Sequence, residues 1–454
     1  MGFIHNLCNR EDMDVEDWAE LNGRHHVKKR KAGRVFHQKC VSLQKNNVMS
    51  NIELLYIKDF GPIKETTVCI RRITVLIGEQ GAGKSCIAKL YSLFSWLEKA
   101  LMRRMLTIKD VVRYARFRKI YAAYNNLDSY FKQTTMLRFE GFHYVFLYTN
   151  ETLEIKEKVM ENDSFSIAKV MYVPAERNVL GGVDHPARLK GLTEPMMNFL
   201  DEYDKARNVL KNGYAVPFGN VDFEYDALND ISKLRNPDYE VRLSAASSGF
   251  QSSLPLLLVS RNLSDMVRDS SMKEVLSDRE RKALQKEVEA IFSNGSLSED
   301  VKMASLNMLS SRYRYSRFVN IVEEMELNLF PDSQKNVLYE LVGDACKLSD
   351  NRLVMTTHSP YVINYLTLSV KASQVAAEIT RKNRPDLLER IGEVVPVKGM
   401  ISEEDLIIYE MDKGVARVLD NYDGLPSDRN FLNVSLEDTN RAFDELLEIE
   451  EELG

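Results

Sequence analysis

The sequence lacks the features that mark membrane-spanning and disulfide-rich secreted proteins. No apolar run approaches the roughly 20 residues that a membrane helix needs, and the N-terminus has no signal-peptide core. The five cysteines of the 454-residue chain have no paired spacing, which predicts free thiols in a reducing compartment. Internal repeats and low-complexity segments are also missing. We therefore expect a folded, cytoplasmic protein without a membrane partner.

An overall excess of positive charge is missing too, so any basic surface must be local. The net charge is −6, from 61 basic and 67 acidic residues. Residues 103–138 differ, because nine basic and two acidic side chains give this segment a charge of +7, with aromatic residues between them. Such a segment suits nucleic-acid phosphates or an acidic protein that imitates them. The alternative is a helical subdomain with solvated charges and its aromatic residues in its own core. The basic residues are Arg103, Arg104, Lys109, Arg113, Arg116, Arg118, Lys119, Lys132 and Arg138.

What the sequence does contain is an alternation of strand and helix patterns, which predicts an α/β fold. We expect a mixed β-sheet flanked by helices, with helical insertions. Residues 1–48 are expected to be a mobile N-terminal extension. The chain is then expected to divide into a lobe at 49–102, the basic helical insertion at 103–138, a continuation of the lobe at 139–250, a helical segment at 251–316, the last part of the lobe at 317–400, and a C-terminal segment at 401–454. Ser435 is predicted to cap an acidic helix in this last segment.

The strongest motif is GEQGAGKS, which fits the phosphate-binding pattern G-x-x-x-x-G-K-S without a gap. In a chain of this length the pattern occurs by chance about once in fifty sequences. A strand pattern precedes it and a helix pattern begins at Lys84, so backbone N–H groups and a helix N-terminus can bind phosphate oxygens. The alternative interpretation is a glycine-rich β-turn. We predict an ATP site in which Lys84 reaches the β- and γ-phosphates and Ser85 is a ligand of Mg²⁺. Its residues are Gly78, Glu79, Gln80, Gly81, Ala82, Gly83, Lys84 and Ser85.

Hydrolysis needs carboxylates at the end of another strand, and RFVNIVEEMELNLFP provides them. An apolar run ends in Glu323 and Glu324, with Glu326 two residues later. We expect Glu323 to bind the Mg²⁺ ion and Glu324 to orient and deprotonate the attacking water. An acidic helix start is the alternative.

Two further segments suit a nucleotide site. In RLVMTTHSPYVI a strand pattern ends just before His358, which is predicted to bond the γ-phosphate or the attacking water. In LSAASSGFQSSL, small hydroxyl residues and a glycine precede an apolar helix, a pattern that suits an anion but is more often an ordinary helix cap. The residues of this second segment are Ser247, Ser248, Gly249 and Gln251.

In this order and spacing the four motifs resemble the ABC-type ATPase superfamily over about residues 50–370. Within it the chain is similar to the branch shared by SMC/Rad50-like ATPases and the OLD-like, AAA15/AAA21-type proteins of bacterial defence. LYIKDFGPIKETTV resembles the first strands of that branch, THSPYVI its switch-histidine motif, and SSGFQ its signature. EEME replaces the frequent E-E-P-E, with Met325 in place of proline. YVPAERN resembles its P-A-E-R segment, which implies that Arg177 faces nucleotide or a neighbouring subunit; a surface salt bridge is the alternative. No glutamine-loop residue is identifiable.

The resemblance implies that the signature acts on the ATP of another subunit. The active unit is then at least a dimer, and a higher-order ring is expected. The missing coiled coil and nuclease domain favour stand-alone ATPases such as those of the PARIS and Septu anti-phage systems. The resemblance to the PARIS ATPase implies a Toprim-like nuclease effector as partner and an acidic phage protein that imitates DNA as trigger. Slow ATP hydrolysis suits such a switch, because bound ATP then acts as a stored assembly state. The alternative is an SMC/Rad50-like DNA-repair or DNA-clamp ATPase, which normally has a long coiled coil between the segments that contain Ser85 and Ser247.

Overall fold

The computed structural model of the chain describes residues 52–158, 166–210, 213–269, 278–294, 296 and 298–453. The predicted N-terminal extension at 1–48 lies outside this part of the chain.

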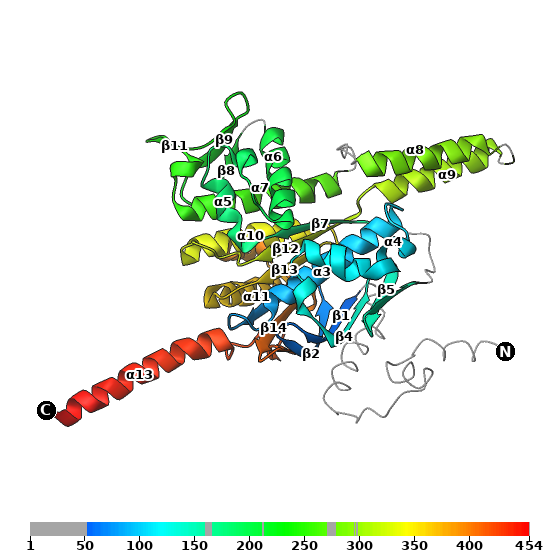
Figure 1. The fold of residues 1–454 in the computed structure, drawn as a ribbon. Coiled ribbons are helices and arrows are strands. Elements are labelled where there is room, and N and C mark those ends of the chain that lie inside the picture. Colours follow the sequence, from blue (N-terminus) through cyan, green and yellow to red (C-terminus); the bar gives the residue numbers. More distant parts are fainter. Residues whose placement is uncertain are drawn as a thin grey trace. The chain divides into compact units, whose positions relative to one another are not determined.

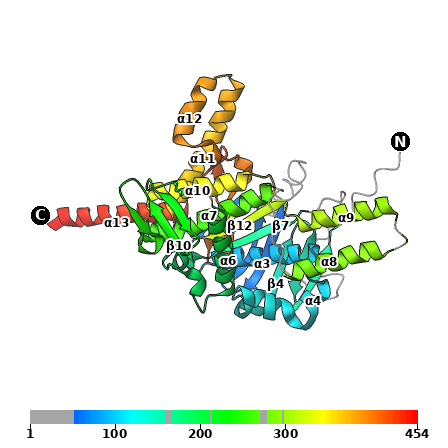
Figure 2. The ribbon, with the colours of Figure 1, turned by 90° about the horizontal axis from the view of Figure 1, so that it is seen from above.

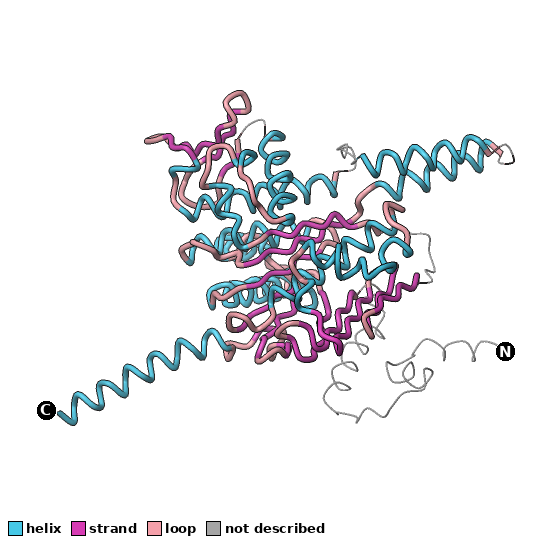
Figure 3. Tube along the Cα trace, viewed as in Figure 1, coloured by secondary structure: helices cyan, strands magenta, loops and turns pink. Residues whose placement is uncertain are grey.

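A six-stranded sheet lies at the centre of the described chain, with the strand order β15-β14-β3-β13-β12-β7 (Figure 1, Figure 3). Strand β15 pairs antiparallel with β14, and the other neighbours pair in parallel. Every residue of β3, β12 and β13 is buried, as expected of parallel strands with continuous apolar runs. The predicted α/β fold with a mixed sheet is therefore confirmed. The strands are β3 Ile73–Gly78, β7 Ala168–Val173, β12 Arg317–Glu323, β13 Arg352–Thr356, β14 Leu406–Asp412 and β15 Val415–Val418.

A second, antiparallel sheet has the order β2-β1-β4-β5-β6. Helix α3, Lys84–Met102, contacts the central sheet, and its Phe94 stacks on Phe139 of the second sheet with ring centroids 5.3 Å apart. The helix thus fills the space between the two sheets, and its bounds agree with the prediction. The strands are β1 Glu53–Phe60, β2 Ile63–Ile70, β4 Phe131–Glu140, β5 Tyr144–Thr149 and β6 Thr152–Glu157.

The prediction of a helical insertion through Arg138 is wrong at its C-terminal end. Residues from Phe131 onward form β4, which pairs with β1. Apolar residues alternate along the second half of β4, so one face of the strand is buried against the core. The helical part is limited to α4, Ile108–Val112, and the short turns up to Tyr130.

Helices α7 and α10 pack on each other, α7 against β12 and α10 against β13, while α8 and α9 lie side by side as an antiparallel pair (Figure 2). Within the predicted helical segment at 251–316 the described residues form α7, α8 and α9, of which α9 was not predicted separately. The remaining helices are α5 Asn178–Gly181, α6 Glu194–Val209, α7 Ser248–Arg268, α8 Asp278–Ser293, α9 Glu299–Tyr313, α10 Pro331–Cys346, α11 Pro360–Arg381, α12 Leu388–Val394 and α13 Phe431–Leu453.

A small four-stranded sheet with the order β11-β10-β9-β8 was not predicted. Its strands have only two to five residues each, too few for a clear strand pattern in the sequence. Phe218, next to this sheet, stacks on Phe250 of α7 with ring centroids 5.0 Å apart, which supports the start of that helix. The strands are β8 Tyr214–Ala215, β9 Asp222–Asp226, β10 Ile231–Arg235 and β11 Glu240–Arg242.

The C-terminal segment is not separate from the lobe, because β14 pairs directly with β3. The cap prediction is also wrong, since α13 begins at Phe431 and Ser435 lies inside it. The Asn430 side chain accepts hydrogen bonds from the N–H groups of Leu432 and Asn433, so Asn430 caps the helix. A two-stranded ribbon, β16 Asn421–Tyr422 and β17 Leu425–Pro426, precedes it. Within the described chain, none of the helices is both long and apolar enough to cross a bilayer.

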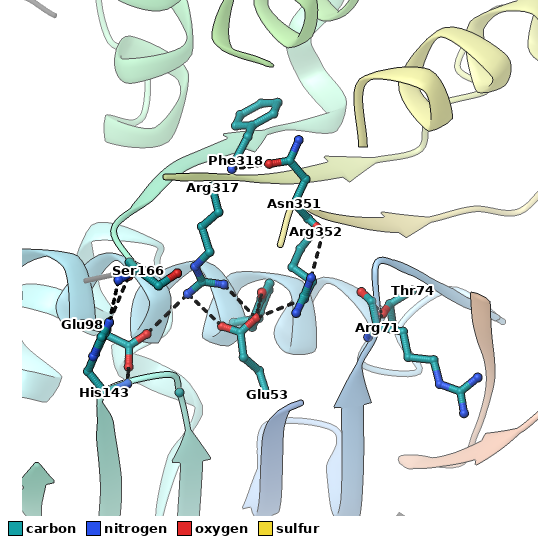
Figure 4. A network of polar contacts seen from close by, with 12 residues as sticks. Glu53, Arg71, Thr74, Glu98, His143, Ser166, Arg317, Phe318, Asn351 and Arg352 are labelled. Carbon is teal, nitrogen blue, oxygen red and sulfur yellow. Dashed lines mark hydrogen bonds and ion pairs between the residues drawn. The ribbon is translucent and has the colours of Figure 1, made fainter. Parts of the chain in front are cut away.

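At the amino ends of the central strands, buried charges join the two sheets (Figure 4). Arg317, the first residue of β12, donates to both oxygens of Glu53 on β1, at 3.0 and 3.2 Å, and to Glu98 of α3 at 3.4 Å. Burial raises the pKa of Glu53, but Arg317 and Arg352 outweigh it, so the pKa lies below its usual range. This network therefore connects the two sheets at the amino ends of the central strands.

Two cysteines in the described part of the chain, Cys86 and Cys346, are free thiols, as predicted.

Candidate functional site

The glycine-rich turn between β3 and α3 has a backbone that requires glycine. Gly81 and Gly83 have φ angles of 73° and 109°, which L side chains rarely adopt. A Cβ atom on Gly83 would lie 2.8 Å from Cγ1 of Ile63, and one on Gly78 would lie 2.4 Å from the carbonyl oxygen of Met411. Nothing lies within 4 Å of the position of a Cβ atom on Gly81. The turn is therefore tightly packed at Gly78 and Gly83 and open at Gly81, as a backbone loop that surrounds a phosphate group requires.

Lys84 lies across this turn. Its side chain is buried, and Nζ donates to the carbonyl oxygens of Gly78 and Glu79 at 2.7 and 2.8 Å. Burial lowers the pKa of Lys84, while Glu324, Glu326 and Glu323 oppose this shift. The ammonium group is thus held at the mouth of the turn, where phosphate oxygens can replace the two carbonyls as acceptors.

Three strands end together beside the turn. Strand β13 lies between β3 and β12, and all three are parallel. Glu323 is in register with Thr356, and Thr356 with Leu76, two residues before Gly78. Because the carboxyl ends of parallel strands lie at one edge of a sheet, Glu323 and Glu324 come to the same edge as the glycine-rich turn.

Glu323 is the last residue of β12 and is buried. Its Oε1 atom has no hydrogen-bond partner among the described residues. The Tyr172 hydroxyl is also buried, and burial together with Glu323 raises the pKa of Tyr172. A buried carboxylate oxygen without a protein donor suits a metal ligand, and Ser85 is exposed in the first turn of α3. These two residues fit Mg²⁺ on a bound triphosphate.

Glu324 sits at a sharp turn of the chain. Its φ angle is 45°, and its N–H donates to the carbonyl oxygen and to Oγ1 of Thr356, at 3.0 and 3.2 Å. A non-glycine residue in the left-handed region is uncommon and is held here by β13. The turn separates the side-chain positions of the two adjacent glutamates, so each can take a different role.

His358 follows β13, and Glu326 holds its backbone. Oε1 of Glu326 accepts the N–H of His358 at 2.6 Å, whereas Oε2 is buried and has no partner among the described residues. Burial and Lys84 lower the pKa of His358, although Glu324 opposes them, so the imidazole is neutral at neutral pH. Burial raises the pKa of Glu326. Sequence reasoning gave Glu326 no role; a third acidic residue two positions after an acidic pair was the available signal.

The signature segment begins helix α7. Ser247 and Ser248 are exposed, and Ser247 makes no side-chain capping bond. Gly249 packs against the segment after Glu326, because its Cβ position lies 2.9 Å from the carbonyl oxygen of Asn328. The amide nitrogen of Gln251 donates to three carbonyls, those of Leu243, Ser244 and Ala246. In this structure Gln251 thus orders the approach to the helix, and the serines are the exposed groups.

The structure therefore brings one group of predicted residues together. Lys84 interacts electrostatically with all three glutamates, and His358 with Lys84 and Glu324. The signature segment instead contacts residues 327–329.

Arg177 does not occupy the predicted position. It is fully buried, with its guanidinium bonded to backbone carbonyls, so it neither faces a neighbour nor forms a surface salt bridge. The apolar β7 that precedes it leads the chain into the core, which the motif alone did not show.

For the basic segment at 103–138 we gave two interpretations, a binding surface for phosphates or an acidic protein and a subdomain with its own aromatic core. The structure agrees with each of them in part. Phe117 and Phe131 are buried in the core, and Arg103 is buried with Glu280 at 2.6 Å. Tyr114, in contrast, is 83% exposed and has a φ angle of 57°. The exposed basic residues of the same segment are Arg104, Lys109, Arg113, Lys119 and Lys132.

Comparison with known proteins gives distant structural similarity only. No family model and no curated protein matches the chain. The SMC head domain from Thermotoga maritima aligns with a TM-score of 0.33 and 10% identity, over 82% of this chain and 99% of that one. The recombination mediator protein RecF aligns with a TM-score of 0.26 and 9% identity, over 81% and 98%. MJ1267, an ATP-binding cassette of an ABC transporter, aligns with a TM-score of 0.28 and 10% identity, over 81% and 91%. Similarities this distant do not decide a function, and the site rests on the geometry above.

Proposed function

We propose that the chain is an ABC-type ATPase that binds and hydrolyses ATP at a seam between two copies of itself. One observation carries the proposal. A lysine on a phosphate-binding turn, three carboxylates and a neutral histidine gather at one sheet edge, while the signature serines are exposed at the start of another helix. A helix start that packs against residues 327–329 of its own chain and leaves two serines exposed suits the nucleotide of a second subunit.

Each residue then has a definite task. The turn and Lys84 bind the phosphates, and Ser85 with Glu323 would hold Mg²⁺, which neutralises charge on the phosphate oxygens when bound. Glu324 accepts the proton of the attacking water, and the neutral His358 orients that water or the γ-phosphate. Ser247 and Ser248 of the partner close the site and exclude solvent.

Sedimentation velocity with and without ATP tests this function. We expect the Glu324→Gln variant to bind ATP and associate into dimers or larger assemblies, because its nucleotide is not hydrolysed. Lys84→Ala should remain unassociated, since it loses the phosphate contact. An assembly state of Glu324→Gln that does not change with ATP would contradict the proposal.

We propose further that this ATPase serves bacterial anti-phage defence in the manner of AriA, the ATPase of the PARIS system. In this role a cytoplasmic ring holds a Toprim-like nuclease effector and releases it when an acidic phage protein is sensed. The support is the motif resemblance and the exposed basic residues of the 103–138 segment, which suit an acidic trigger. Slow hydrolysis suits such a switch. Co-purification with the product of the neighbouring reading frame, followed by mass measurement, tests it; an HNH nuclease there would favour the PtuA-like ATPases instead.

The second candidate is an SMC/Rad50-like ATPase that acts on DNA directly. The exposed basic and aromatic residues of the 103–138 segment favour it, whereas the described helices between Ser85 and Ser247 have at most the 19 residues of α3, far fewer than a long coiled coil. Binding to duplex DNA that is tight and falls steeply with salt would support this candidate over the defence role.

A further inference from the structure

Arg177 is a buried cation at the junction of three segments of the ATPase site. It follows β7 in a short 3-10 turn, Ala175–Arg177, and its side chain is completely inaccessible to solvent. Nη1 donates to the carbonyl oxygens of Glu323 at 2.6 Å and Pro174 at 3.2 Å. Nη2 donates to that of Glu324 at 2.7 Å, and Nε to that of Ser252 at 3.0 Å.

These acceptors are unusual for a buried arginine, because all four are backbone carbonyls. Burial lowers the pKa of Arg177 to about 10, although Glu326, Glu324 and Glu323 oppose the shift, so the side chain is charged at neutral pH. A buried charge is costly unless its hydrogen bonds are satisfied. Packing alone could be provided by an apolar side chain. Only the planar, multiply donating guanidinium can bind three separate segments at once.

The segments that it joins belong to two different ATP sites. Glu323 and Glu324 act on the subunit's own nucleotide. Ser252 lies in the second turn of α7, whose first residues, Ser247 and Ser248, would face the nucleotide of the partner. A second bond reinforces the connection, since Oγ of Ser252 donates to the carbonyl oxygen of Leu327 at 2.8 Å.

The surrounding packing makes this junction stiff. A Cβ atom on Gly181 would lie 2.3 Å from the carbonyl oxygen of Gln251, so the helix after Arg177 lies directly on α7. Glu324 keeps a left-handed backbone between its bonds to Thr356 and to Arg177. A small displacement of the 323–324 backbone can therefore reach α7 without being absorbed in a loop.

We infer that Arg177 is a positioning residue that couples the two sites: it transmits the position of the Glu323–Glu324 backbone in one subunit to the signature helix presented to the other. This inference rests on the proposed seam between subunits. It assigns to the Arg177 guanidinium a role in setting turnover and assembly, without contact with nucleotide.

The test compares Arg177→Lys with Arg317→Lys, because both arginines are fully buried and only the first touches the ATPase segments. We measure melting temperature, ATP affinity of the unassociated chain, ATP-dependent association and turnover per folded molecule. Arg177→Lys should change ATP affinity by less than about 3-fold and lower turnover and association by about 10- to 100-fold, as a misplaced catalytic group does. Arg317→Lys should lower the melting temperature and leave turnover per folded molecule unchanged.

If Arg177→Lys does not fold, a second variant with a smaller change tests the same inference. Ser252→Ala removes the bond to Leu327 and a longer one to the carbonyl oxygen of Gly249 within α7, and it should lower turnover by about 3-fold or more at unchanged ATP affinity. In a double-mutant cycle, Ser252→Ala and Ser248→Ala should be non-additive. Equal turnover in Ser252→Ala and wild type, or lost ATP affinity in Arg177→Lys, would overturn the inference. If wild-type chains do not associate with ATP at all, the proposed seam itself fails, which is a separate result.

Discussion

The two ends of the central sheet hold buried arginines in opposite ways. At the amino ends, Arg317 is bound by the carboxylates of Glu53 and Glu98, and charge is matched with charge. At the carboxyl ends, Arg177 is bound only by backbone carbonyls, although three glutamates lie nearby.

The arginine at the amino ends neutralises buried carboxylates, whereas the arginine at the carboxyl ends leaves the nearby carboxylates unpaired. An ion pair at the carboxyl ends would occupy the carboxylates that we propose to bind Mg²⁺ and to accept a proton from water. Because Arg177 uses the carbonyls of Glu323 and Glu324, the side chains of these residues stay available. At the amino ends no ligand is needed, and paired charges can join the two sheets directly.

The largest expected effect is a loss of ATP turnover when a carboxylate at the carboxyl ends of the central strands is replaced. Glu324→Gln should lower turnover by about 10²- to 10⁴-fold, because an amide cannot accept the proton of the attacking water. Glu326→Gln is the matched control, since its amide oxygen can still accept the His358 N–H. Steady-state phosphate release measures both. Equal losses in the two variants would place the base elsewhere.

The next largest effect should be a loss of folding stability without a loss of turnover. Arg317→Met leaves Glu53 and Glu98 buried without a cation and should lower the free energy of unfolding by about 3–5 kcal/mol. Urea unfolding measures this change. Turnover per folded molecule should remain at the wild-type value; a loss of turnover in the folded fraction would show that the amino ends also serve the chemistry.

A smaller effect should follow from the phosphate turn. Gly83→Ala places a Cβ atom against Ile63 at a φ angle of 109°, which should cost about 1–3 kcal/mol. Calorimetric titration should show ATP affinity reduced by about 10- to 100-fold. Gly392→Ala is the control, because its Cβ position has nothing within 4 Å. Unchanged affinity in Gly83→Ala would mean that phosphates bind elsewhere.

The smallest effect is a pH dependence at the amino ends. His143 accepts the N–H of Ser166, and burial lowers its pKa to about 4. The unfolded histidine titrates near 6.5, so the unfolded state binds more protons between about pH 6.5 and 4, and stability falls as the pH falls. The wild type should lose about 2 kcal/mol more than His143→Gln between pH 7 and 5. Parallel losses in urea unfolding would contradict this assignment.

Local pattern was enough to predict the elements that lie next to the P-loop. The bounds of α3, and those of β12 and β13 to within a residue, follow from continuous apolar runs and clear boundary residues. The turn and the glutamate pair follow from spacing, and parallel pairing brings them to one edge. Their chemical roles, and those of the signature serines, stay predictions.

The elements that local pattern did not predict depend on tertiary contacts. Strands β8 to β11 have only two to five residues each, and β14 joins the central sheet from far along the chain. The burial of Arg177 depends on carbonyls of residues 252, 323 and 324, which no spacing brings together. The bond between Glu326 and His358 likewise forms only when two strands end side by side.

Mixing two inactive variants tests the central claim most directly. Lys84→Ala lacks the phosphate contact and Ser248→Arg blocks the signature, so each alone should have no turnover. In a mixed dimer, the intact turn of the Ser248→Arg chain meets the intact signature of the Lys84→Ala chain and makes one complete site. Because neither variant should pair with itself, equal mixing should give mixed dimers with one complete site of two and restore up to about half of wild-type turnover. If the variants pair by mass measurement and turnover does not return, the site is not shared between subunits.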